Sequence, residues 1–199
     1  AIETTDFSLV AQTKTSTTHP HEEGVAAGVL TALLKLLQKG RIAPEEVILV
    51  AHSTTQATNA LLEGDVAKVG IIAMGSGLKS IRLRRQTQIE DIELAPGKLL
   101  RTCYRFLNPA RNFTDETIRA TIQALQAEGA RALVATEALS MDRPGHEQQV
   151  VALAQALGMP ATSAQQISQL YGLRLRTRTA VINASMMPVM MATAEMLER

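Results

Sequence analysis

The stretch VILVAHSTTQATNALLE, residues 47–63, contains the signals of a strand, a polar turn and a helix in succession. The β-branched run VILV at 47–50 is typical of a buried strand, and the hydroxyl cluster at 53–55 is typical of a helix start. We expect this helix to end at Gly64. A second apolar run at 69–74 is also followed by turn and helix signals, so the sequence predicts an α/β fold with mostly parallel strands.

The helix predicted after residue 53 carries polar side chains on one face. Thr54 lies four residues before Thr58, and Thr55 lies four residues before Asn59, beside the free N–H groups of the first helical turn. Threonine and asparagine are poor helix formers, so a bound anion or polar substrate is a candidate reason for their presence. The alternative is that Ser53 or Thr54 is an ordinary N-cap and Asn59 is merely exposed.

Composition narrows the class of protein. With 46% hydrophobic and 20% charged residues, the chain of 199 residues can bury a substantial core. The 20 basic and 19 acidic residues give a net charge of +1, which provides no general field for nucleic acid or an acidic membrane. The single Cys103 excludes an internal disulfide, and no apolar run approaches the roughly 18–20 residues that span a bilayer. We therefore expect a soluble, cytoplasmic protein without nucleic-acid or membrane partners.

The pattern along the chain suggests two α/β parts. Residues 1–85 form the first part, with a strand at 7–17, a helix ending before Gly40 and the HSTTQATN strand-turn-helix. Residues 86–112 are expected to be an irregular connection. Residues 113–199 form the second part, with helices at 114–129 and 144–157 around a strand in ARALVATEAL. It ends in a methionine-rich helix from about Thr179, which we expect to kink at Pro188.

Other candidate sites carry weaker signals. His19 and His21 have a spacing that a metal could use, but no further ligands accompany them, so we expect no metal site. The turn at 75–77 lacks the third glycine and the Lys-Ser/Thr of phosphate loops. The basic cluster at 79–85 is typical of a solvated face, although it could also neutralise phosphate. His146 and Glu147 form a weak acid/base pair on spacing alone, because adjacent helical residues do not face each other.

Several motifs together resemble one enzyme family. HSTTQATNALLE at 52–63 resembles the H-G-T-T-x-A-T-N-A-L-L-E segment of hydantoinase A and 5-oxoprolinase proteins, which are ATP-dependent enzymes acting on cyclic amides. Four further stretches are similar to family segments in the same order: TKTSTTHPHEEGVAAGV (13–29), VGIIAMGSGLKS (69–80), RPGHEQQV (143–150) and RTRTAVINASMMPVM (176–190). The resemblance therefore covers nearly the whole chain.

The sequence also departs from this family at specific points. Ser53 stands where the family has glycine in its H-G-T-T element, and Ser80 stands where it has an acidic residue. The family begins with a D-x-G-G-T-x-T-D phosphate loop, which this sequence lacks, and it continues for several hundred residues beyond the segment matched by 176–190. We therefore expect the chain to be a fragment of a larger subunit.

The resemblance implies a fold of the ribonuclease-H-like, actin-like ATPase type and the use of ATP and Mg²⁺ by the complete subunit. It implies a hydrolase that phosphorylates an amide oxygen and then opens a ring C–N bond, with this fragment alone inactive. We expect Thr54, Thr55, Thr58 and Asn59 to line the nucleotide and substrate pocket, with His52 and Arg176 as further members. The sequence does not identify the catalytic residues.

The resemblance also implies partners. These are a cyclic amide substrate, the remainder of the subunit and a hydantoinase B-type subunit. Two other functions stay open: a non-catalytic regulatory or reactivating module with the actin-like fold, and an α/β interaction domain. The sequence does not decide among hydantoin, oxoproline, another lactam and a carboxylation substrate, and it does not define the oligomeric state.

Overall fold

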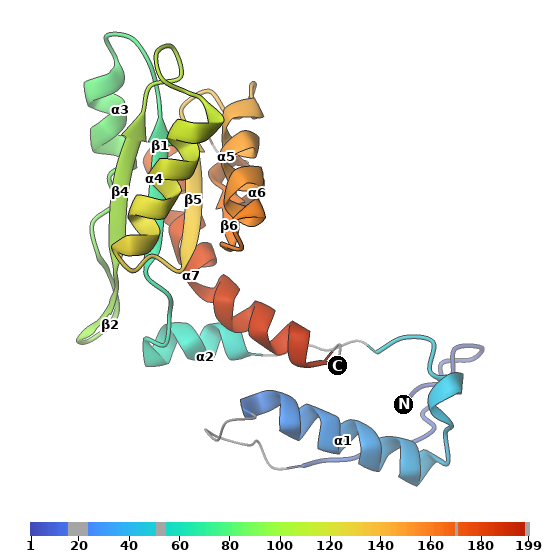
Figure 1. Cartoon of the computed structure of the whole chain (residues 1–199). Helices are drawn as coiled ribbons and strands as arrows, with labels where there is room; N and C mark the ends of the chain where they lie inside the picture. Colours follow the sequence, from blue (N-terminus) through green and yellow to red (C-terminus); the bar gives the residue numbers. More distant parts are fainter. Residues whose placement is uncertain (16–23, 51–54, 170, 198–199) are drawn as a thin grey trace. The chain divides into compact units, whose positions relative to one another are not determined.

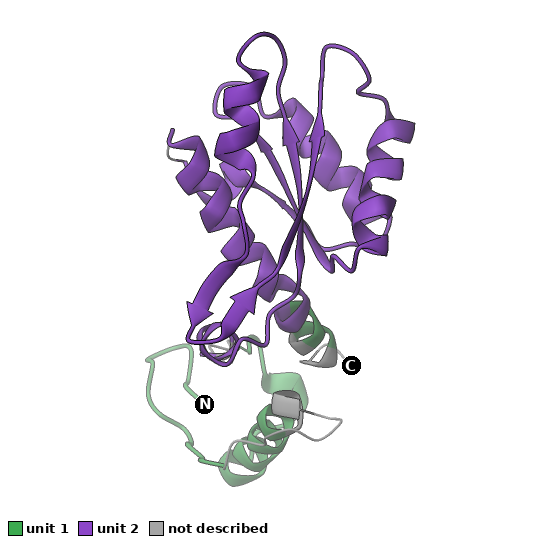
Figure 2. Ribbon diagram, turned by 90° about the vertical axis from the view of Figure 1, so that its left-hand side faces the viewer, with its two compact units in different colours: residues 1–54, 191–199 green, residues 55–190 purple. Residues whose placement is uncertain are grey.

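The chain, for which we use a computed structural model, is described at residues 1–15, 24–50, 55–169 and 171–197. It forms two compact units, one of residues 1–54 with 191–199 and one of residues 55–190 (Figure 2). Among the described residues, no helix has both the length and the apolar composition needed to cross a bilayer.

The described residues of the smaller unit include the helix α1 (Gly24–Gly40) and the 3-10 turn η1 (Pro44–Glu46). The predicted helix ended before Gly40, and α1 includes Gly40 as its last residue. Its last turn is closed by a hydrogen bond of 3.0 Å from the N–H of Ile42 to the C=O of Leu37. Arg41 takes the left-handed conformation, with φ of 51°, at the position where glycine is most common. The closing hydrogen bond therefore compensates for a strained residue.

Two strands predicted for this unit are not formed by its described residues. Residues 7–15 contribute only the isolated bridge between Ile2 and Leu9, and residues 47–50 are extended without a strand partner. Ile48 and Leu49 are 82% and 81% exposed. A strand needs a neighbour to satisfy its backbone N–H and C=O groups, and no described segment supplies one. The prediction of a buried strand at 47–50 is therefore wrong, as is that of a strand over the described part of 7–17.

The larger unit is built on a four-stranded sheet in the order β4-β1-β5-β6, in which every neighbouring pair is parallel (Figure 1). The strands are β1 (Val69–Met74), β4 (Thr102–Leu107), β5 (Ala132–Glu137) and β6 (Ala161–Ser163). All six residues of β1 are buried. This agrees with the unbroken apolar run in its sequence, because a parallel sheet is covered on both faces.

This sheet corrects the predicted domain boundaries. β1 comes from the predicted first part, yet it pairs along its whole length with β4 and with β5. The supposed irregular connection at 86–112 contains β4 and the antiparallel hairpin of β2 (Ile92–Ala95) and β3 (Lys98–Leu100). The periodicity of each segment reveals a strand but not its partner, so no local pattern indicated that the two predicted parts share one sheet.

Helices cover both faces of the sheet. α4 (Asp115–Ala127) and α5 (Gly145–Ala156) pack on one face, where the buried side chains include Ile72, Ile118 and Val150. α7 (Leu173–Leu197) packs on the other face through Ala180 and Val181, which lie in one cluster with Ile71 and Val134. In Figure 1, α4 crosses in front of the sheet and α7 runs behind it. Each fully buried aliphatic side chain contributes about 1.5–3 kcal/mol, so both faces stabilise the unit.

Local signals placed several of these helices well. Thr114 is the N-cap of α4 and accepts a hydrogen bond of 3.3 Å from the N–H of Thr117, and Gly129 after the helix has φ of 90°.

The shorter helices are α2 (Gln56–Glu63), α3 (Ser80–Thr87) and α6 (Ala164–Ile167). α7 begins at Leu173, earlier than the predicted start near Thr179, and it continues through Pro188.

Candidate functional site

The polar face predicted from the sequence lies on α2. Thr55 occupies the N-cap position without a side-chain capping hydrogen bond, and Thr58 and Asn59 are exposed one turn further on. Ala60 on the same helix is buried. His52 and Thr54 lie outside the described residues. The described polar side chains of this face are therefore available to a ligand or to another part of the protein.

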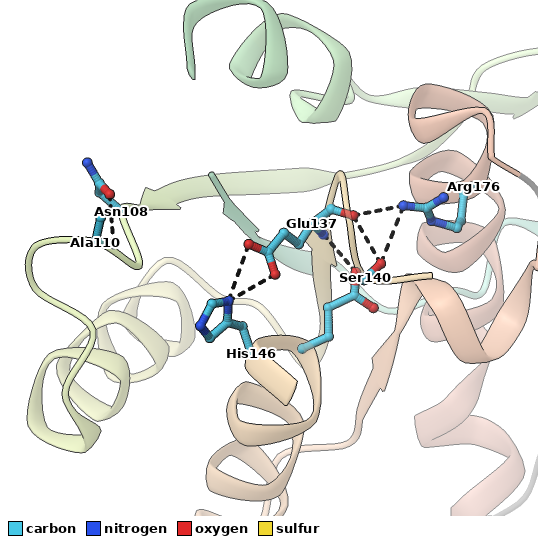
Figure 3. Close-up of polar contacts among 7 residues, drawn as sticks. Asn108, Ala110, Glu137, Ser140, His146 and Arg176 are labelled. Carbon is cyan, nitrogen blue, oxygen red and sulfur yellow. Dashed lines mark hydrogen bonds and ion pairs between the residues drawn. The ribbon is translucent and has the colours of Figure 1, made fainter. Parts of the chain in front are cut away.

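Arg176 does not join this group. It lies near the start of α7, is fully buried, and donates from Nη2 to the C=O of Glu137 at 2.8 Å and to Oγ of Ser140 at 3.4 Å (Figure 3). Glu137 ends β5, so Arg176 lies at the carboxyl edge of the sheet. In contrast, α2 leads into the amino end of β1 (Figure 1). Within the described unit, Arg176 holds the loop after β5 in place.

The topology directs attention to the carboxyl edge. In chain order the parallel strands are β1, β4, β5 and β6, and β4 is added on one side of β1 whereas β5 and β6 are added on the other. The direction of winding thus reverses between β1 and β5. In open α/β sheets, ligands bind outside the carboxyl ends of the strands at such a reversal. The polar residues after β1 and β5 are therefore a second candidate site.

A buried carboxylate organises this edge. Glu147, in the first turn of α5, is fully buried and accepts the N–H of Glu137 at 2.7 Å and the N–H of Gln165 at 3.1 Å. Burial raises the pKa of Glu147, while these hydrogen bonds and the charge of Arg176 act in the opposite direction. The residue joins the ends of β5 and β6, so its role is to position the loops that follow them.

His146, the neighbour of Glu147 in the chain, belongs to a more accessible pair. Nδ1 of His146 is 3.0 Å from Oε2 of Glu137, and their side chains are 44% and 15% exposed (Figure 3). The ring of Phe113 meets the imidazole edge-on with 4.8 Å between centroids. A carboxylate on Nδ1 fixes the orientation of an imidazole and leaves Nε2 for other partners. This arrangement can accept or donate a proton at the edge of the sheet.

Only part of this cluster was predicted from the sequence. His146 and Glu147 were weak candidates because adjacent helical residues diverge, and the structure agrees: the imidazole meets the Glu137 carboxylate while Glu147 binds backbone N–H groups. Glu137 and Ser140 carried no sequence signal, since their partners come from α5 and α7. Among the described residues, no three His, Cys, Asp or Glu side chains converge as a metal site. His19 and His21 lie outside the described residues.

Comparison with solved structures gives the class of the fold. The nucleotide-free structure of an ATP-dependent acetone carboxylase is similar to this chain, with a TM-score of 0.53 and 16% sequence identity. The match covers 90% of this chain and 31% of the acetone carboxylase chain, so this chain spans about a third of that protein's length. The expected α/β fold with mostly parallel strands is confirmed.

The sequence then gives the family. The model of the hydantoinase/oxoprolinase N-terminal region matches residues 1–158, and the chain belongs to this family. The resemblance of the four motifs within residues 1–158 is thereby confirmed, whereas the stretch at 176–190 lies outside the matched residues. Comparison with curated proteins gave no match.

Proposed function

We propose that this chain is the N-terminal part of an ATP-dependent enzyme that opens the C–N bond of a cyclic amide of the hydantoin or oxoproline class. The family match over residues 1–158 carries this proposal. The matched residues include the HSTTQATN segment and the strands β1 and β5, whose carboxyl ends lead into the second candidate site. We also propose that the protein is cytoplasmic, because ATP is abundant there.

The chemistry requires activation of a poor electrophile. In the complete enzyme, ATP would transfer its γ-phosphoryl group to the amide oxygen and leave as ADP, which activates the ring carbon for attack by water. The C–N bond would then break as the nitrogen takes a proton, and the products would be the ring-opened carboxylate and inorganic phosphate. The role we assign to this chain is binding and orientation. Thr55, Thr58 and Asn59 offer hydroxyl and amide groups that are exposed within the described structure, and each can direct a hydrogen bond at a nucleotide or a planar amide.

The same proposal requires that the other groups that bind nucleotide and substrate come from outside this chain. The described residues supply no convergent set of metal ligands, whereas Mg²⁺ bound to ATP takes many of its ligands from phosphate and water. The remainder of the subunit and a B-type subunit are the proposed sources of the other protein ligands. His52 and Thr54 remain proposed members of this pocket. The proposed role of Arg176 is to position the loop after β5, at the other edge of the sheet.

The test uses the complete enzyme and Asn59. Asn59→Ala should lower kcat/KM for amide-dependent ATP hydrolysis by about ten- to a hundredfold, because it removes one directed hydrogen bond from a partly dry pocket. Gln123→Ala, at an exposed position on α4, is the matched control and should leave the rate unchanged. Equal rates for both variants and the unmodified enzyme would exclude α2 from the pocket.

The same assay separates the alternative substrates. The assay compares three additions as activators of ATP hydrolysis: hydantoin, 5-oxoproline, and acetone with bicarbonate. Acetone with bicarbonate is included because the chain is structurally similar to acetone carboxylase. Stimulation only by acetone with bicarbonate would replace the cyclic amide by a carboxylation substrate. ATP binding without stimulation by any of them would instead support a non-catalytic regulatory module.

A further inference from the structure

α3 presents a mixed basic and apolar surface. Ile81, Arg82 and Arg85 are all exposed, Ile81 by 67%. Residues three and four positions apart share one side of a helix, so Arg85 neighbours both Ile81 and Arg82. Leu78, in the turn before the helix, is fully exposed. An exposed aliphatic pair beside two arginines is unusual for a helix that meets only water.

The first turns of α7 repeat this combination. Arg174, Leu175 and Arg178 are exposed, Leu175 by 58%, and Tyr171 before the helix is 77% exposed. Nη1 of Arg174 donates to the C=O of Arg85 at 3.3 Å. This bond brings the end of α3 beside the start of α7. We call the surface formed by Ile81, Arg82, Arg85, Arg174, Leu175 and Arg178 the α3–α7 face.

The α3–α7 face concentrates positive charge in a nearly neutral chain. The net charge is +1, yet no Asp or Glu occurs between Asp65 and Glu90 or between Glu147 and Glu195. In the described part of the chain, the ion pairs are Arg101–Asp91, Arg105–Glu128 and His146–Glu137, so the four arginines of the face are not held in intramolecular ion pairs. Their charge is available to an acidic partner.

The composition indicates the kind of partner. A second copy of this face would place arginine against arginine, and like charges across an interface cost several kcal/mol. Nucleic acid would use the arginines but not the aliphatic side chains. Arginine and tyrosine are enriched in protein interfaces and lysine is depleted, and exposed aliphatic side chains beside them add apolar area that a protein partner can bury. We infer that the α3–α7 face docks an acidic amphipathic helix of another polypeptide.

Peptide binding to the 199-residue protein tests this inference. The probe is a fluorescent helical peptide with leucines on one face and glutamates flanking them, and its binding is followed by anisotropy. The double variant Arg85→Glu with Arg178→Glu should weaken binding by about ten- to a hundredfold, because both sides of the face reverse charge. Arg111→Glu with Arg131→Glu makes the same charge change at exposed positions elsewhere and should leave binding unchanged.

Three further measurements can overturn the inference. A peptide with lysine in place of glutamate should not bind, and equal affinity for both peptides would show that charge does not direct docking. Ile81→Ser with Leu175→Ser should weaken binding even at high salt, where exposed ion pairs are screened. Binding to phosphatidylserine vesicles or duplex DNA in place of the acidic peptide, or binding to none of these probes, would show that the occupant is not an acidic helix.

Discussion

The α2 face and the carboxyl-edge cluster are both polar, but their hydrogen-bonding groups are used differently. On α2, Thr55 makes no side-chain capping bond, and Thr58 and Asn59 are exposed. At the carboxyl edge, Glu147 and Arg176 are fully buried and bind the backbone of the loop after β5. Substitutions should therefore affect stability at the carboxyl edge and ligand interactions on α2.

The largest loss of stability is expected for Glu147→Ala. It leaves the N–H groups of Glu137 and Gln165 buried without their acceptor, which costs about 3–5 kcal/mol in the free energy of unfolding. Urea denaturation of the 199-residue protein measures this loss. Glu147→Gln keeps one acceptor oxygen and should lose clearly less. Equal losses for both variants would mean that charge, and not hydrogen bonding, is what the site requires.

A smaller loss, about 2–3 kcal/mol, is expected for Arg176→Met. Methionine fills similar space but cannot donate to the C=O of Glu137 or to Oγ of Ser140. Arg178→Met, at an exposed position on the same helix, is the control and should change stability by less than about 0.5 kcal/mol. A stable Arg176→Met protein would remove the argument that this arginine supports the loop.

A still smaller effect should appear in the pH dependence of stability. Burial raises the pKa of Glu147, so the folded chain binds this proton more tightly than the unfolded chain does. Protonated Glu147 contributes its full stabilisation below about pH 4, near the ordinary pKa of glutamate in the unfolded chain. This contribution is lost as the pH rises through the raised pKa of Glu147 in the folded chain. The free energy of unfolding of the unmodified protein should therefore fall relative to Glu147→Gln across that range. A rise would show that the backbone N–H groups and Arg176 outweigh burial.

The smallest effect on stability is expected for Thr58→Ala on α2. Alanine is a better helix former than threonine, and the side chain is exposed, so stability should rise by a few tenths of a kcal/mol. Thermal unfolding of the 199-residue protein measures it. A loss above about 1 kcal/mol would mean that Thr58 packs against another part of the chain and would weaken its assignment as a ligand contact.

Sequence patterns predicted elements whose signals are local. The apolar run at 69–74 forms β1, and Thr114 caps α4 as expected. The run at 47–50 has the same apolar character but no strand partner among the described residues, so composition alone did not distinguish the two cases. The start of α7 was placed too late because basic and hydroxyl residues at 174–179 interrupt its apolar pattern.

The candidate sites show the same limit. The α2 face was found because its residues lie close together in one motif, whereas Glu137, Ser140 and Arg176 meet only after β5, the following turn and α7 have packed together. Their sequence separation hides any pattern. A reversal in the strand order, which indicated this second site, is likewise a property of the folded sheet and not of any one segment.

The central position of β1 also affects synthesis of the chain. β1 is complete at residue 74, but its neighbours β4 and β5 begin only at residues 102 and 132. At about 5–20 residues per second, an apolar strand with two open edges waits seconds for its partners during translation. Unpaired strands of this kind associate readily with other chains. The yield of folded protein in the cell should therefore depend on chaperones that shield residues 69–74 until the second neighbour has been made.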